Sequence, residues 1–96
     1  MVRGNISFAP KASTDLRSIS IWYNQQKEGL ADDFLKALDE ILKKVERNPT
    51  AFTFARRLVR RCKVKKFPYN VYYSHLNGIV VVRVRHVKQK PLKRFT

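Results

Sequence analysis

The sequence has little of several residue types on which common functional sites depend. One cysteine, Cys62, excludes a disulfide framework, and with only two histidines it does not make a ligand set for a metal ion. The glycines are few and isolated, so no glycine-rich loop is present to bind a phosphate. No apolar run approaches the roughly 18 residues of a membrane-spanning helix, and the first residues lack the apolar core of a signal peptide. We therefore expect a cytoplasmic protein with no metal, no cofactor and no membrane partner.

Acidic residues are missing from the second half of the chain. Residues 1–49 hold all 7 Asp and Glu beside 8 Lys and Arg, whereas residues 50–96 hold 13 Lys and Arg and no acid. This field of one sign, within a net charge of +14, favours a polyanionic partner, which is either nucleic acid or a strongly acidic protein. The absence of carboxylates leaves His75 and His86 as the candidate acids or bases of this half.

The strongest local signal is a β-hairpin between Lys65 and His86. Asn77-Gly78 separates two runs rich in β-branched and aromatic residues, which predicts a type I′ turn that pairs Leu76 with Ile79. Alternation then gives an apolar face with the pairs His75/Val80, Tyr73/Val82, Val71/Val84 and Tyr69/His86. The opposite face has the pairs Ser74/Val81, Tyr72/Arg83 and Asn70/Arg85. We expect the first face to join the core and the second, with its two arginines, to line a polar surface.

Periodicity and breaker residues predict the remaining elements. Residues 2–8 alternate as a short strand, Pro10 begins a helix that Gly29 ends, and a second helix runs from Leu30 to Asn48-Pro49. The helix residues expected in the core are Ala12, Leu16, Ile19, Tyr23 and its neighbour Trp22, then Phe34, Leu38, Ile41, Leu42 and Val45. Residues 50–57 indicate an irregular connection. Residues 58–65 predict a strand with Leu58, Cys62 and Val64 on one face and Val59, Arg61, Lys63 and Lys65 on the other.

Together these elements predict an α+β fold in the order β-α-α-β-β-β, in a single domain over residues 1–96. The last three strands form an antiparallel sheet, and the N-terminal helical hairpin packs on one face of it. The other face gathers Arg61, Lys63, Tyr72, Arg83 and Arg85. Residues 87–96 are basic and poorly patterned, and we expect this tail to be partly mobile.

A series of short motifs extends over nearly the whole chain, from Ile6 to Pro91. The motifs are Ala12-Ser13-Thr14-Asp15-Leu16, Trp22-Tyr23, Gln26 with Gly29-Leu30, Phe34-Leu35 with Leu38, Asn48-Pro49, Val59-Arg60-Arg61, Phe67-Pro68-Tyr69, Val71-Tyr72-Tyr73, and His86 with Pro91. In their order and spacing they resemble the RelE/ParE superfamily of toxins from type II toxin-antitoxin modules, and more closely its ParE, plasmid-stabilisation branch. The resemblance implies a toxin that inhibits growth by binding DNA gyrase and that an acidic cognate antitoxin holds silent.

Two positions depart from the patterns of the superfamily. Its RNase members usually carry an arginine after the tyrosine that opens the third strand, where this chain has Asn70. ParE-like chains often have an arginine between the histidine and the proline, where this chain has Gln89 flanked by Lys88 and Lys90. The first departure argues against RNA cleavage, and the second leaves the two lysines as substitutes for the arginine.

Three functions remain open from the sequence. The leading hypothesis is a ParE-like gyrase inhibitor, which would not be an enzyme, with the candidate target- or nucleic-acid-binding residues Arg60, Arg61, Lys63, Tyr72, Arg83, Arg85 and Lys88. The first alternative is a RelE-type endonuclease that cleaves mRNA on the ribosome. RNA cleavage needs a base, an acid and cations around the phosphate, and His86 is the candidate catalytic residue under that alternative alone. The second alternative is a small RNA-binding protein without toxicity.

Overall fold

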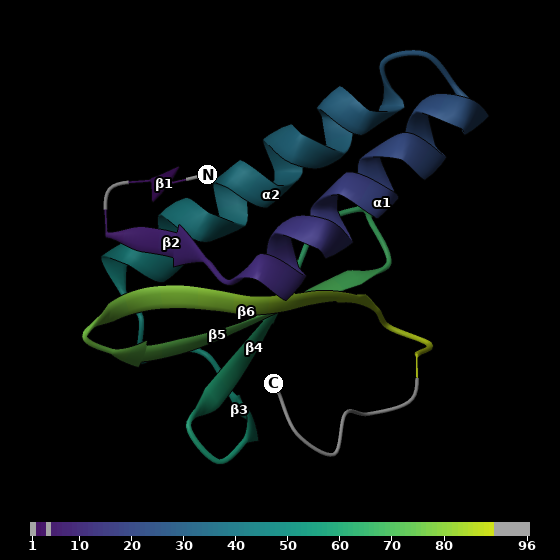
Figure 1. Ribbon diagram of the computed structural model, residues 1–96. Helices are drawn as coiled ribbons and strands as arrows, with labels where there is room; N and C mark the ends of the chain where they lie inside the picture. Colours follow the sequence, from purple (N-terminus) through teal and green to yellow (C-terminus); the bar gives the residue numbers. More distant parts are fainter. Residues whose placement is uncertain (1, 4, 90–96) are drawn as a thin grey trace.

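The computed structural model describes residues 2, 3 and 5–89, and in them two helices lie over one face of a six-stranded sheet (Figure 1). The elements are β1 (Val2–Arg3), β2 (Ile6–Phe8), α1 (Pro10–Gln26), α2 (Leu30–Arg47), β3 (Phe54–Arg56), β4 (Val59–Lys63), β5 (Tyr69–Leu76) and β6 (Gly78–His86). This arrangement confirms the predicted α+β fold and its helical hairpin. Two details are additions: residues 2–8 divide into the antiparallel pair β1 and β2, and β3 lies within the predicted irregular connection.

The sheet has the strand order β1-β2-β6-β5-β4-β3. The predicted antiparallel meander of β4, β5 and β6 is confirmed, and β2 adds a parallel pair through Ile6↔Ile79 and Phe8↔Val81. A parallel neighbour needs a long connection, which the helical hairpin supplies. The N–H of Ala9 donates to the carbonyl of Val81 at 2.9 Å, so the chain leaves the edge of β6 there and enters α1.

The β5–β6 hairpin contains a β-bulge that the sequence did not indicate. The predicted pairs Tyr69↔His86, Val71↔Val84 and Tyr72↔Arg83 are confirmed. Beyond a register shift at Tyr72/Tyr73, however, Tyr73 pairs with Val81 and Leu76 with Gly78, so the predicted pairs near the turn are wrong by one residue. The physical reason is a tighter turn, in which Gly78 alone has a positive φ, of 83°. Val82 is the extra residue that the bulge absorbs.

The core lies between the helices and the sheet. Its helix residues include the predicted stripe of α1 and most of that of α2, and Ala31 joins them: Ala12, Leu16, Ile19, Tyr23, Ala31, Phe34, Leu38, Leu42 and Val45. The sheet contributes Ile6, Cys62, Val64, Val71, Tyr73, Ile79, Val81 and Val84. Tyr73 is fully buried, and its hydroxyl donates to the carbonyl of Pro49 at 2.7 Å, which joins β5 to the end of the helical hairpin.

Two apolar residues that were expected inside lie at the surface. Trp22 is 52% exposed, because it projects beside the buried stripe of α1 rather than on it. Leu58 is 59% exposed, because β4 begins one residue later and Leu58 belongs to the turn from β3. Arg57, which precedes it in that turn, has a φ of 40°, a backbone conformation that few side chains adopt.

The segment before β4 is ordered by Arg60. Its guanidinium donates to the carbonyls of Thr50 at 3.2 Å and Phe52 at 2.6 Å and lies 3.8 Å from the centre of the Phe54 ring. The predicted irregular connection of residues 50–57 therefore contains a short edge strand, β3, which pairs with β4 through Phe54↔Arg60. Arg60 is therefore a structural cation, held on the surface next to its own loop.

Further expectations concern helix ends, metal sites, membranes and the tail. α1 ends at Gln26, and Gly29, with a φ of 84°, precedes α2 instead of ending α1. In the described residues no cluster of side chains suits a metal ion, and neither helix is long and apolar enough to cross a bilayer. Val87–Gln89 form a turn after β6, whereas residues 90–96 of the predicted tail lie outside the described part of the chain.

Candidate functional site

Two rows of polar residues cross β4, β5 and β6. Strand pairing aligns Arg61, Tyr72 and Arg83 in one row and Lys63, Asn70 and Arg85 in the other. Between them lies the row Cys62, Val71 and Val84, which is buried against the helices. Because side chains alternate along a strand, the two polar rows belong to the opposite face of the sheet. We call these six residues the basic face, and their function in binding stays a prediction.

Within the basic face, Arg83 forms an ion pair with an acidic residue of α1. Its Nε donates to Asp15 Oδ2 at 2.7 Å and its Nη2 to Asp15 Oδ1 at 3.0 Å, which raises the pKa of Arg83. The backbone N–H of Val84 donates to the same Asp15 Oδ2 at 3.0 Å. β2 covers β6 only as far as Val81, so Asp15 satisfies a donor that no neighbouring strand reaches.

Arg85 is the least satisfied cation of the basic face. Its Nε and Nη1 atoms are buried and have no hydrogen-bond partner among the described residues. A buried donor without a partner is unfavourable by about 1–3 kcal/mol, so these two nitrogens of Arg85 lower the stability of the fold as it stands. Arg61 is exposed on β4, which is separated from β6 by β5, and it extends the positive charge of the basic face to that strand.

The remaining lysine candidates lie at the same end of the sheet, where β4 and β6 both end. Lys63 is exposed, and its Nζ donates to the carbonyls of Val64 at 3.3 Å and Phe67 at 3.0 Å in the turn after β4. Lys88 lies in the turn after β6, exposed, and its backbone N–H donates to His86 Nδ1 at 3.0 Å. Both lysines are exposed, whereas Arg60 and Arg83 are partly buried and bind, respectively, two carbonyls of the preceding loop and Asp15.

The structure separates His86 from the basic face. His86 follows Arg85 in β6 and therefore projects toward the helix side, where its ring contacts Tyr69 edge to face at a centroid distance of 5.3 Å. Its Nδ1 accepts the N–H of Lys88, so the neutral ring carries its proton on Nε2. His86 and the cations that would stabilise a cleaved phosphate thus lie on opposite faces of β6.

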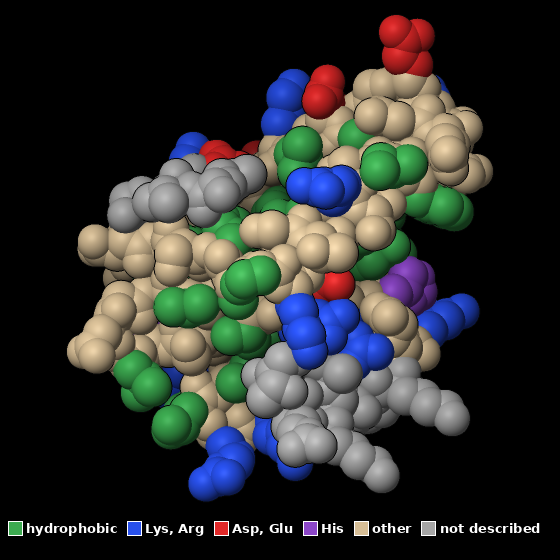
Figure 2. Space-filling model, in the orientation of Figure 1, with side chains coloured by type: hydrophobic (Ala, Val, Ile, Leu, Met, Phe, Trp, Pro, Cys, Tyr) green, Lys and Arg blue, Asp and Glu red, His purple; other side chains and the backbone are tan. Residues whose placement is uncertain are grey.

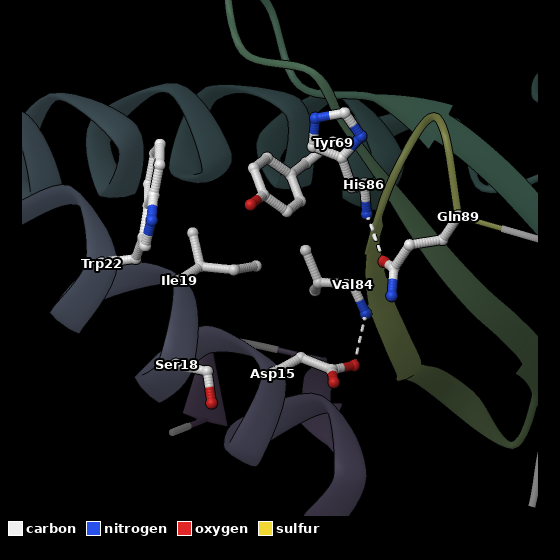
Figure 3. Close-up of a pocket in the computed structure, with 8 residues that line it drawn as sticks. All are labelled: Asp15, Ser18, Ile19, Trp22, Tyr69, Val84, His86 and Gln89. Atoms are coloured by element: carbon white, nitrogen blue, oxygen red, sulfur yellow. Dashed lines mark hydrogen bonds between the residues drawn. The ribbon is translucent and has the colours of Figure 1, made fainter.

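A cavity of about 240 Å³ opens between α1 and the end of β6 (Figure 3). It is lined by Asp15, Ser18, Ile19, Trp22, Tyr69, Val84, His86 and Gln89. Figure 3 shows Ile19 and Val84 facing each other across it, with Trp22 on one side and Tyr69 with His86 on the other. We call it the α1–β6 cavity. On the molecular surface, Lys and Arg side chains lie beside an acidic side chain at this boundary between helices and sheet, close to a histidine (Figure 2).

Comparison with known proteins decides the family. A family profile described as the ParE toxin of the type II toxin-antitoxin system, parDE, matches residues 6–91. The chain belongs to the ParE toxin family. A solved structure titled "Chromosomal ParDE TA system from P. aeruginosa" has the same fold, with a TM-score of 0.62 and 18% identity, and the match covers 84% of this chain and 92% of that one. No protein with a curated description matches this chain.

The family result confirms the resemblance found in the sequence, and it identifies this chain as the toxin of a type II toxin-antitoxin system. A ParDE system implies a cognate antitoxin as a partner of this ParE toxin. Of the seven predicted site residues, the pairing of strands brings together Arg61, Lys63, Tyr72, Arg83 and Arg85. It leaves Arg60 beside β3 and Lys88 beyond β6.

Sequence reasoning missed the α1–β6 cavity of this ParE toxin. Ser18, Ile19 and Trp22 lie on adjacent turns of α1, but the sequence offers no sign that the end of β6 would lie opposite them. The one available signal was Trp22 itself, a large apolar residue just beside a helical stripe that was already complete.

Proposed function

We propose that this ParE toxin inhibits growth by binding DNA gyrase, and that an acidic cognate antitoxin neutralises it in the cytoplasm. The proposal rests on the fact that the cations of the basic face and His86 lie on opposite faces of β6. The basic face presents cations but no histidine and no carboxylate of its own, and His86 lies on the other face of β6 beside Tyr69. Such a surface is suited to binding more than to bond cleavage.

The charge of the chain supports an acidic antitoxin. The net charge is +14, and Asp15 of the toxin itself is bound to Arg83 of the basic face. An acidic segment that covers this face would associate fast, with a rate that falls as salt is added. A segment that is disordered when free can wrap a surface of this size and fold as it binds.

Two assays on the purified toxin test the proposal. In the first, supercoiled plasmid is incubated with gyrase and toxin, and we expect gyrase-dependent linear DNA that the protein encoded beside this gene suppresses. In the second, mRNA on purified ribosomes is incubated with toxin, and we expect intact mRNA. Cleaved mRNA together with unaffected gyrase would replace the proposal by the endonuclease alternative.

A pair of charge variants makes the first assay specific. Arg85→Ala removes the cation whose Nε and Nη1 have no hydrogen-bond partner in the described part of the chain, and Lys27→Ala removes an exposed cation at the turn between the helices. We expect the first variant to lose gyrase poisoning and the second to keep it. Equal loss in both would show that net charge, and not the basic face, carries the effect.

A further inference from the structure

A groove runs between α2 and the turn of residues 64–68, which joins β4 to β5. It consists of two cavities of about 500 Å³ and 340 Å³, which have four lining residues in common, Ala37, Glu40, Lys65 and Lys66. Each volume lies within the ~300–1,000 Å³ that is usual for binding pockets. We call it the α2–turn groove. It shares no lining residue with the α1–β6 cavity and is therefore a separate site.

The lining of the α2–turn groove includes apolar side chains from both walls. Ala37 and Ile41 are half-buried on α2, Phe67 is half-buried on the turn, and Val64 is fully buried after β4. The Phe67 ring is fixed, since it contacts the buried Phe34 edge to face at a centroid distance of 5.3 Å. An apolar side chain of a partner therefore meets a preformed surface here.

The turn that forms one wall is held in an unusual conformation. Lys66 has a φ of 69°, a region that residues other than glycine rarely adopt. The Val64 N–H donates to the Tyr69 carbonyl at 2.9 Å. The Nζ of Lys63 donates to the carbonyl of Phe67 at 3.0 Å. Backbone strain persists only where surrounding contacts impose it and is found preferentially at binding sites, so the turn is a preorganised wall.

Charges of both signs line the α2–turn groove. Helical spacing aligns four exposed side chains on the α2 wall, Asp33, Lys36, Glu40 and Lys44. The other wall adds three exposed lysines, Lys63, Lys65 and Lys66. Neither Asp33 nor Glu40 forms an ion pair with another residue in the described part of the chain. The groove thus offers ammonium donors together with two available carboxylates.

The two carboxylates decide which class of partner fits. A nucleic acid would bring phosphates, and a strongly acidic chain would bring carboxylates, against Asp33 and Glu40. Such like-charge contacts exclude wrong partners from a site. A polypeptide segment of mixed charge avoids them, because its acids bind the lysines while its backbone N–H groups or cations bind the two carboxylates. Charge complementarity therefore favours a mixed-charge segment of a protein.

We propose that the α2–turn groove binds a mixed-charge segment of gyrase, which places an apolar side chain against Ala37 and Ile41 and its acidic groups against the lysines. The inference rests on the proposed function, in which gyrase is the target. Continuity of the surface supports it, because Lys63 belongs to the basic face and also lines the groove. A target bound to the basic face reaches the groove around the end of β4, so the toxin holds gyrase at two adjoining surfaces.

Charge reversals in the groove and outside it test the proposal. Lys65→Glu reverses a cation of the turn, and Glu40→Lys reverses an acid of α2, both at exposed positions. Lys27→Glu and Glu28→Lys make the same two changes at the exposed turn between the helices, which does not line the groove. Biolayer interferometry gives the dissociation constant of each full-length variant for gyrase holoenzyme, with and without DNA. Circular dichroism confirms that each variant is folded.

The two groove variants should both bind gyrase more weakly. We expect Lys65→Glu and Glu40→Lys each to raise the dissociation constant at least about fivefold, and the two control variants to change it less than about twofold. The result for Glu40→Lys is the more specific, because this variant makes the toxin more positive and would strengthen binding to any polyanion.

The outcomes separate the two proposals. A wild-type toxin that does not bind gyrase would overturn the proposed function, and the groove's assignment with it. Gyrase binding that is unchanged in Lys65→Glu and Glu40→Lys would overturn the groove while the gyrase inhibitor stands. Tighter binding by Glu40→Lys would show a polyanionic occupant instead, which is DNA if the gain requires DNA. Loss of antitoxin binding with unchanged gyrase binding would assign the groove to the antitoxin.

Discussion

Asp15 and Arg83 stand 68 residues apart in the sequence and form a two-point ion pair between α1 and β6. The side chains are only 16% and 21% exposed, and the same carboxylate accepts the N–H of Val84. One acidic residue thus fixes the first helix against the uncovered edge of β6. Because of this ion pair, Arg83 holds α1 against β6 and is not a free cation of the basic face.

Removal of this carboxylate should destabilise the fold. Asp15→Ala leaves the Arg83 guanidinium and the Val84 N–H without their acceptor, so we expect the free energy of unfolding to fall by about 2–3 kcal/mol. Asp15→Asn keeps an oxygen for Val84 and should lower it by about 1–2 kcal/mol. Urea denaturation followed by circular dichroism measures both.

The matched control is the exposed ion pair of α2. Lys43 and Asp39 lie 3.6 Å apart, with side chains 56% and 42% exposed. Lys43→Ala should change stability by no more than about 0.5 kcal/mol. If Asp15→Ala and Lys43→Ala had the same free energy of unfolding, the Asp15–Arg83 ion pair would contribute no more to stability than an exposed pair.

Alkaline pH should destabilise the toxin through Cys62. Burial raises the pKa of the Cys62 thiol from 9.0 to about 12. Below pH 9 both the folded and the unfolded chain hold this proton, whereas above it the unfolded chain releases the proton and the folded chain keeps it. Stability is therefore full below about pH 9 and falls as pH rises toward about 12. Tyr73, whose pKa burial raises from 10.0 to about 12, adds to the fall above about pH 10.

Cys62→Ala separates the thiol from the tyrosines. Its free energy of unfolding, measured by urea denaturation at steps between about pH 8 and pH 10, should fall less steeply than that of the wild type. The comparison concerns slopes, so the packing lost with the sulfur does not affect it. Parallel slopes would show that the thiol titrates alike in both states, contrary to its burial in the core.

Local periodicity was sufficient for the helix layer and for most of the sheet. Ala12, Leu16, Ile19 and Tyr23 recur at helical spacing, and all four are buried. The register of the hairpin shows how two local errors can compensate. The turn is one residue tighter than Asn77-Gly78 suggests, and the bulge at Val82 absorbs the difference, so Tyr72 still pairs with Arg83.

The candidate site depends on contacts that no local pattern contains. Asp15 lies near the start of a helix, where an acid is ordinary, and only the tertiary fold brings it to Arg83. Likewise, the alternation of residues 58–65 separates Arg60 from the face of its exposed neighbour Arg61, but no local pattern shows that Arg60 binds two carbonyls of the preceding loop. The α1–β6 cavity exists only because β2 ends at Phe8 and leaves the end of β6 open to α1.

Charge reversal on the basic face should slow antitoxin binding. Arg61→Glu and Arg85→Glu each change the charge by two at positions that strand pairing places on this face. We expect the association rate to fall at least about tenfold and its dependence on salt to flatten. Stopped-flow measurements at several salt concentrations give both quantities. Lys27→Glu, the same change at the helix turn, should keep the wild-type rate, and an equal effect there would assign the steering to net charge alone.

Growth inhibition should depend on Arg85 and not on His86. Arg85→Ala removes the cation that has two buried nitrogens without a hydrogen-bond partner among residues 2, 3 and 5–89, so we expect induced toxin to lose its effect on colony formation. His86→Ala removes a ring that contacts Tyr69 on the other face of β6, so toxicity should persist. If the toxin were instead an mRNA endonuclease with His86 as its acid or base, His86→Ala would lower cleavage by at least about a hundredfold.

Arg83→Ala is not a clean test, because it also breaks the ion pair with Asp15. Each variant must first show the wild-type circular dichroism spectrum, since the loss of Tyr69 packing can itself unfold the chain. A folded His86→Ala protein without toxicity, beside a folded and toxic Arg85→Ala protein, would reverse the assignment in favour of the endonuclease.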